Sequence, residues 1–251
     1  MRQLVLSLVL GIIFLFLGVT CASGHMFWLN SNTYNPEKGE TIFIEIGFGH
    51  KFPRDQAVKD KQLAEVYALN PSGQKVSVNK IFPAFYSFTP SQDGYYQVIA
   101  TMKPGFVSKT PGGHKLGNKK DTENAISCFR FNMTATALIE VGDSNKGYSS
   151  KNKTPLQLLV ITAPEEMGSG SSLSIKALFQ GEPQAGVKIM STYAGYKDHW
   201  VIEKETNEQG LVKFQTQHKG PWYIRAKYNK PYPDKDVCDQ YYYSSCLTLN
   251  F

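Results

Sequence analysis

His25 stands directly behind a hydrophobic N-terminal segment, in the run Gly24-His25-Met26-Phe27-Trp28-Leu29. If the chain is cut after Gly24, the free amine and the imidazole Nδ1 of His25 can close a six-membered chelate ring on a divalent metal. Both nitrogens lose their proton near neutral pH, since the reference pKa is about 8 for an α-amine and about 6.5 for imidazole. Nitrogen ligands suit nickel, cobalt, copper and zinc. The alternative is a surface histidine at a frayed terminus.

The segment before His25 has the pattern of a secretory signal peptide, residues 1–24. Arg2 supplies the positive end, and an apolar run of about 14 residues follows, short of the roughly 20 that cross a bilayer. A retained membrane anchor is the alternative. No second run of this kind follows, so we expect a periplasmic or secreted mature chain with no membrane span. A cut after Ala22 would instead leave Ser23-Gly24-His25, whose third-position histidine favours square-planar Cu(II) or Ni(II). A lipoprotein cut before Cys21 ranks last.

Two further histidines are candidate metal ligands. His50 ends the clearest predicted strand, residues 41–50, where the neighbouring Gly49 leaves room for the ring. If the first strand lies beside it, His25 and His50 come close. His114 lies in the Gly- and Pro-rich segment 103–121, which we expect to be a loop that can bring it onto a bound ion. The alternatives are that His50 only caps a strand end and that His114 is solvated.

Glu45 and Asp55 are candidate hydrogen-bond partners for a ligating imidazole, on sequence proximity alone. His199 and His218 belong to the second half of the chain, where we expect surface or packing roles.

The elements that position these residues are strands. Aromatic residues make up 13% of the chain, and Gly and Pro are frequent, which favours strands and turns over helices. Strand-like runs recur at spacings typical of antiparallel sandwiches, while residues 125–141 suit a strand or a short helix equally. A polar stretch at residues 143–155 is the best boundary. We therefore predict an N-terminal β-rich metal-site domain at 25–142, a linker at 143–155 and a seven-stranded sandwich at 156–251.

Three motifs make the second half similar to the transthyretin-like and carboxypeptidase-regulatory-like sandwich: Gly-x-Pro-x-x-Gly-Val (181–187), Thr-Asn-Glu-x-Gly (206–210) and Gly-Pro-Trp-Tyr-Ile (220–224). The fold class expected for the whole is all-β, with two tandem Ig-like or transthyretin-like β-sandwich domains after a cleaved signal peptide.

The order of motifs along the mature chain resembles a family of bacterial exported proteins that carry a domain of unknown function. The motifs are His-x-Phe-Trp-Leu (25–29), Gly-His-x-Phe-Pro (49–53), Gly-Tyr-Tyr-x-Val (94–98) and Lys-Pro-Gly (103–105). Members are often associated with nickel and cobalt uptake as a periplasmic component of ABC-type systems. The resemblance implies a metal-handling role, with His25 and His50 matching its motifs.

The sequence thus predicts a periplasmic binding protein for a divalent transition metal, not an enzyme, with nickel or cobalt favoured over copper or zinc. Its expected partners are the metal ion and an inner-membrane transporter permease. A net charge of +6 does not imply nucleic acid, because no nucleic-acid motif is present. No hydrolase motif is present either. Two alternatives stay open: a sandwich binding or adhesion module without metal, and a copper enzyme with a histidine brace.

The cysteines of an exported chain lie in an oxidising compartment. Cys21 leaves with the leader under the favoured cut, which leaves three. Cys238 and Cys246 close a short Tyr-rich loop, and we expect them to form a disulfide. Cys128 is then the odd one, expected to be a buried small hydrophobic residue.

Overall fold

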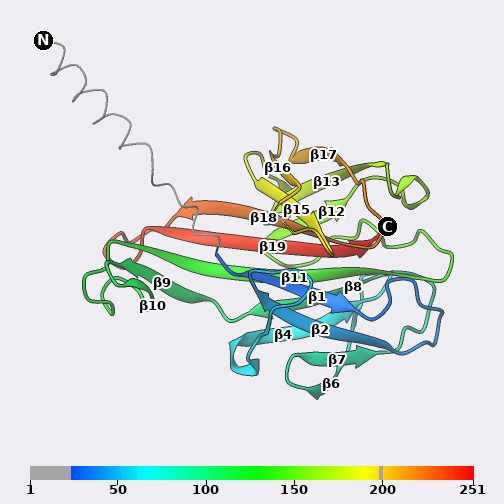
Figure 1. Ribbon diagram of the computed structural model, residues 1–251, viewed down its shortest axis with the longest axis horizontal. Coiled ribbons are helices and arrows are strands. Elements are labelled where there is room, and N and C mark those ends of the chain that lie inside the picture. The colour runs from blue at the N-terminus through cyan, green and yellow to red at the C-terminus, as the bar shows by residue number, and fades with distance from the viewer. Residues whose placement is uncertain (1–23, 198–199) are drawn as a thin grey trace, which may run out of the picture.

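The polypeptide forms three β-sheets in the computed structural model of Figure 1, which describes residues 24–197 and 200–251. Helical geometry in these ranges is limited to two short 3-10 turns, η2 (Asp60–Gln62) and η3 (Pro164–Glu166). The predicted all-β fold class is confirmed.

Alternating apolar and polar residues build the first sheet. In β2 (Ile42–Gly49), Ile42, Ile44 and Ile46 are buried, whereas Phe43 and Glu45 face outward, because successive side chains of a strand point to opposite faces. The sheet order is β1–β2–β7–β6, with β3 beside the end of β2. The other strands are β1 (Met26–Ser31), β3 (Gln56–Ala57), β6 (Asn79–Phe82) and β7 (Phe85–Phe88).

The largest sheet runs across the molecule and combines strands from both halves of the sequence (Figure 1). Its order is β16–β15–β18–β19–β11–β8–β4–β5, and the hairpin β9–β10 pairs with the early part of β11. The strands are β4 (Leu63–Leu69), β5 (Lys75–Val76), β8 (Gly94–Met102), β9 (Gly105–Thr110), β10 (Gly113–Leu116), β11 (Ser127–Val141), β15 (Lys188–Tyr193), β16 (Ile202–Glu205), β18 (Pro221–Pro231) and β19 (Gln240–Asn250).

The third sheet packs against the C-terminal strands of the largest one, β15, β18 and β19. Its strands are β12 (Leu156–Val160), β13 (Ser172–Phe179), β14 (Glu182–Pro183) and β17 (Leu211–Gln215), with β13 pairing to the other three. In Figure 1 the long strands β11, β19 and β18 run between this sheet and the first one.

Two hydrophobic cores therefore lie on opposite faces of the largest sheet. In β11, Ala135 and Ala137 belong to the first core and Leu138 to the second. In β19, Cys246 belongs to the first core and Leu247 to the second. Both strands are buried on both faces over residues 133–139 and 244–249, where the polar side chains are small Ser and Thr residues.

Residues 143–155, the predicted linker, connect β11 with β12 but are fastened to the largest sheet. The Gln97 side chain on β8 donates to the Ser150 carbonyl at 2.5 Å and accepts from Asn152 Nδ2 at 3.1 Å. The predicted units 25–142 and 156–251 are joined by continuous strand pairing, since β11 of the first pairs with β19 of the second.

The structure decides two predictions about local secondary structure. Residues 125–141, left open between strand and helix, form the long strand β11. The loop predicted for 103–121 is wrong in its central part, because β9 and β10 form an antiparallel hairpin there. Its Gly and Pro residues mark turns, and the strand pattern between them is short enough to escape notice.

The predicted disulfide between Cys238 and Cys246 is also wrong: Cys128 is bonded to Cys238, and Cys246 is a buried free thiol. Parallel pairing places Phe129 opposite Gln240, which brings Cys128 beside the loop before β19. Cys246 lies well inside β19, and an extended strand rises about 3.3 Å per residue, so it is out of reach of Cys238.

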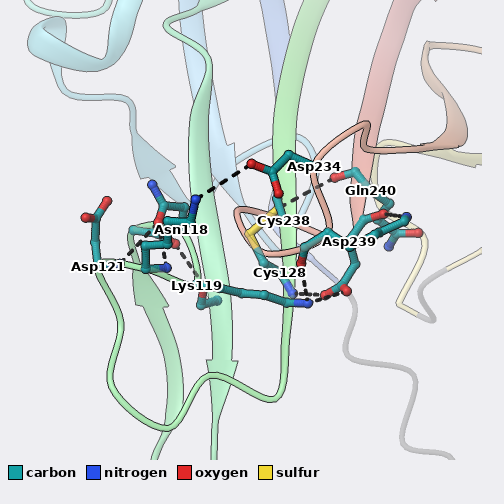
Figure 2. The surroundings of a disulfide bond; sticks show 12 residues. Asn118, Lys119, Asp121, Cys128, Asp234, Cys238, Asp239 and Gln240 are labelled. Atoms are coloured by element: carbon teal, nitrogen blue, oxygen red, sulfur yellow. Dashed lines mark hydrogen bonds and ion pairs between the residues drawn. A yellow bond between two sulfur atoms is a disulfide. The ribbon is translucent and has the colours of Figure 1, made fainter.

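Figure 2 shows the polar surroundings of this disulfide. Asp239 accepts from the backbone N–H of Cys128 at 2.7 Å and pairs with Lys119 from the segment after β10. The disulfide and the ion pair together tie the start of β11 to the β18–β19 connection.

The predicted leader lies outside the described residues except for Gly24. Within the ranges described, no helix is long and apolar enough to cross a bilayer.

Candidate functional site

His25 and His50 lie side by side at one end of the first sheet. The β1–β2 register pairs Met26 with Gly49, so the next residue outward on each strand is a histidine. Their ring centroids are 4.4 Å apart with the planes tilted by 40°. Both residues are exposed at this end. The structure therefore brings together two of the three predicted site histidines.

A neighbouring aromatic ring orients His25. Phe48, partly buried on β2, stacks on the His25 imidazole with centroids 4.8 Å apart and planes only 4° from parallel. Offset and parallel packing of flat rings restricts rotation of the histidine side chain. Phe48 thus holds the His25 ring beside that of His50.

The loop that carries His50 is shaped by Gly49 and Asp55. Gly49 has φ +143°, and a Cβ there would lie 2.2 Å from Asp55 Oδ2, so only glycine fits. The Asp55 carboxylate accepts the His50 backbone N–H at 2.6 Å. Asp55, expected on proximity to bind an imidazole, thus positions the backbone of His50, while Glu45 faces outward on β2.

The same loop is fastened to β1 through one carbonyl. Pro53, which follows a cis peptide bond, accepts from Trp28 Nε1 at 3.0 Å and from Asn30 Nδ2 at 2.7 Å. Trp28 is fully buried and packs against Gly47, where a Cβ would lie 2.2 Å from the indole. These contacts explain the run Gly-x-Gly-His-x-Phe-Pro at the end of β2: each small or cyclic residue makes room for an anchoring contact.

A fully buried arginine from the second half of the chain fixes the start of β1. Arg225 on β18 donates from Nη2 to the His25 carbonyl at 2.9 Å and from Nη1 to the Gly24 carbonyl at 3.1 Å. Its Nε donates to Ser244 Oγ at 3.1 Å, and Nη2 also reaches the Tyr242 hydroxyl at 2.8 Å. The backbone next to the candidate site is therefore held by charge-assisted hydrogen bonds.

This contact is the first of three along the free edge of β1. The carbonyls of residues 25, 27 and 29 accept from Arg225, from the Cys246 thiol at 2.7 Å and from Thr248 Oγ1 at 2.8 Å, respectively. Side chains of β18 and β19 thus satisfy carbonyls that a neighbouring strand would otherwise pair.

The surroundings of His25 favour its neutral imidazole. Partial burial and then the nearby His50 lower the pKa of His25, with Arg225 acting in the same direction and Asp55 opposing. The hydrogen bond from the His50 backbone lowers the pKa of Asp55, which stays ionised. A neutral imidazole is the form that binds a metal ion.

The third predicted ligand lies elsewhere. His114 is an exposed residue of β10, opposite Lys109 of β9, in the hairpin that pairs with the early part of β11. Among the residues described, no group of three or more His, Cys, Asp or Glu side chains is placed to hold a metal ion. The predicted cut after Gly24 would add the α-amine of His25 to the two imidazoles.

His218, expected to have a packing role, stacks on Tyr193 with centroids 4.0 Å apart, and His199 lies outside the described residues. Arg225 is the residue that sequence reasoning missed. Its only signal was one charged residue within the apolar run Trp222-Tyr223-Ile224-Arg225-Ala226.

The fold and this site define an all-β protein whose first two strands carry a histidine pair at one end. The chain belongs to the DUF4198 family, a domain of unknown function, whose model matches residues 22–230. This agrees with the predicted membership of a family with such a domain, and nothing in the match speaks of nickel or cobalt transport.

Similar solved structures are β-sandwich modules at low identity. The D0–D1 domain of intimin is 12% identical with a TM-score of 0.23, covering 89% of this chain and 97% of that one. The fibronectin(III)-like modules of Clostridium thermocellum CbhA are 11% identical with a TM-score of 0.21, covering 88% and 94%. TM-scores this low carry no argument about function. No curated protein matches the chain.

Proposed function

We propose that the mature chain is an exported binding protein for a divalent transition metal, held by the α-amine and imidazole of His25 and the imidazole of His50. The observation that carries this proposal is the 4.4 Å separation of the two imidazole centroids at the exposed end of β1 and β2. A cut after Gly24 adds the third nitrogen.

The separation suits two imidazoles on one ion. Metal–nitrogen bonds of about 2.0–2.1 Å place a ring centroid roughly 3 Å from the metal, so two rings up to roughly 6 Å apart can share it. Three nitrogen ligands leave coordination positions open, which is typical of sites that exchange their metal or bind a further ligand. His114 has no part in this site.

The proposed role is metal uptake, with nickel or cobalt as the favoured cargo and copper or zinc also compatible with nitrogen ligands. In this proposal the protein works outside the inner membrane, delivers metal to a permease and catalyses no reaction. The site at the surface, with Arg225 and Asp55 behind it, supports capture and release.

Calorimetric titration with Ni(II), Co(II), Cu(II) and Zn(II) tests the proposal on protein whose intact mass shows that it begins at His25. We expect His50→Ala to weaken binding at least tenfold, and a chain with an uncut leader to bind no better than that variant. His218→Ala is the matched control, because its ring stacks on Tyr193 away from the site. Affinity unchanged by His25→Ala would overturn the proposal.

The copper-loaded protein from the same titration can be assayed to distinguish a binding protein from the copper-enzyme alternative. A histidine-brace enzyme produces peroxide or oxidises a substrate when its copper is reduced, and a binding protein does neither.

One observation favours the second candidate function, a sandwich binding module. Phe43, Phe85 and Phe82 form a row of near-parallel rings on the outer face of the first sheet, with centroids 5.9 and 4.6 Å apart. Phe82 is 54% exposed, and the adjacent Ile81 is 48% exposed. Exposed apolar clusters of this kind mark interaction sites. This module would bind a glycan or a protein. Binding that persists in the presence of a chelator and is lost in the Phe82→Ser variant would support this function over metal binding.

A further inference from the structure

Arg225 carries a buried positive charge whose observed hydrogen-bond acceptors are all neutral. They are two backbone carbonyls and two hydroxyls, and the guanidinium itself is fully buried. Burying a charge is costly unless an opposite charge or a full set of hydrogen bonds compensates it. In the uncut chain the hydrogen bonds do so.

Removal of the leader after Gly24 takes away one of these acceptors. Nη1 donates to the Gly24 carbonyl, whereas Nη2 and Nε donate to groups that stay in the cut chain: the His25 carbonyl, Tyr242 and Ser244. Cleavage therefore frees one donor of a buried guanidinium and leaves the others in place.

The freed donor lies beside the new terminus. Nη1 is 3.1 Å from the Gly24 oxygen, and standard peptide dimensions put that oxygen about 2.3 Å from the His25 nitrogen, so Nη1 is at most about 5.4 Å from that nitrogen. A metal on the amine and the guanidinium are two positive charges at short range, and an anion between them stabilises both.

We propose that Arg225 Nη1 binds a small carboxylate-type anion, bicarbonate or an organic carboxylate, that also ligates the metal. This inference rests on the proposed function. The anion fills a coordination position left open by the three nitrogens, and the guanidinium supplies the charged donor that carboxylates prefer. The cargo is then a metal together with its carboxylate, and the cut creates the anion position and the metal position at once.

The test uses Cu(II) as the probe metal and the chain that begins at His25. Affinity is measured by calorimetry in carbonate-free, non-coordinating buffer, then with bicarbonate and separately with acetate. We expect binding at least tenfold tighter with one or both anions, and the anion with the larger effect identifies the source. The Cu(II) EPR spectrum should change on adding that anion.

Three variants locate the anion. Arg225→Met removes the donor, and we expect the ratio of the Cu(II) affinities with and without the anion to fall to about one. Tyr242→Phe removes a neutral partner of Nη2 and leaves Nη1 unchanged, so it should keep the anion effect. A chain that begins at Gly24 keeps the carbonyl on Nη1 and still offers an amine and an imidazole, so it should bind Cu(II) without the anion effect. If Arg225→Met does not fold, the comparison of the Gly24 and His25 chains decides.

The outcomes separate the two proposals. Cu(II) binding that is independent of His25 overturns the proposed function and this inference with it. Binding through His25 that is equally tight with and without either anion overturns the inference alone. An anion effect that persists in Arg225→Met, or in the chain that begins at Gly24, also overturns it, because Nη1 is then not the donor.

Discussion

Removing the disulfide between Cys128 and Cys238 should cost the fold more than any other change to a cysteine. The bond closes a loop with a sequence separation of 110 residues. In the chain-entropy description, a loop of that length restricts the unfolded state by about 4.8 kcal/mol at 25 °C. A bond between Cys238 and Cys246 would close a loop of only about eight residues, worth about 2.5 kcal/mol by the same relation. The two pairings therefore differ by roughly 2 kcal/mol.

The assay is urea unfolding of the mature chain and of two single variants. Cys128→Ala breaks the bond, and we expect the free energy of unfolding to fall by as much as about 5 kcal/mol, a large part of the 5–15 kcal/mol typical of a native protein. Cys246→Ala is the control: it keeps the bond and loses only a buried thiol and its contact with the Phe27 carbonyl, a cost of about 1–2 kcal/mol. Peptide mapping without reduction identifies the linkage. A Cys246→Ala variant less stable than Cys128→Ala, or a mapped Cys238–Cys246 peptide, would refute the reasoning.

Other predictions concern the site and the thiol. Gly49→Ala should lower the free energy of unfolding by about 3 kcal/mol, because φ is +143° and the new Cβ would meet Asp55. Gly73→Ala, where φ is +76° and the space around the new Cβ is open, should lower it by about 1 kcal/mol in the same urea experiment. Equal losses of stability in the two variants would contradict this account. Burial raises the pKa of the Cys246 thiol to about 12, so the folded mature chain should not react with a thiol reagent at pH 8 and should react once unfolded; prompt labelling of the native chain would contradict this. Burial lowers the pKa of His25, so the folded uncut chain binds fewer protons there than the unfolded chain. The difference in unfolding free energy between this chain and its His25→Ala variant should favour the uncut chain most above pH 6.5 and shrink as the pH falls below that value. A difference that grows on acidification would contradict the lowered pKa.

Local pattern was sufficient to predict the strands that carry the site. The β-branched and aromatic run 41–50 predicts β2, and the placement of a glycine before His50 predicts the close approach seen there. The meeting of His25 with His50 follows once β1 is assumed to pair with β2, because both histidines then extend the same antiparallel register.

What the sequence could not predict depends on pairing between distant strands. Cys128 reaches Cys238 only because β11 and β19 are parallel neighbours, and no local pattern encodes a parallel contact across 110 residues. Arg225 reaches the His25 carbonyl, 200 positions away in the chain, because β18 pairs with β19 in the sheet against which β1 packs. The predicted disulfide between Cys238 and Cys246 was based on their proximity in the sequence. Because Cys246 lies within the extended strand β19, that proximity does not bring the two sulfurs together.

β19 is synthesised after all the other strands described, yet it lies in the middle of the largest sheet, between β11 and β18. Until residues 240–250 are available, β11 lacks its parallel partner, and the carbonyls of residues 27 and 29 lack the side chains that satisfy them. A nascent chain of this topology cannot complete its N-terminal half first, as many proteins do during synthesis. Strand order therefore delays completion of the largest sheet, and of both cores packed on it, until β19 has been synthesised.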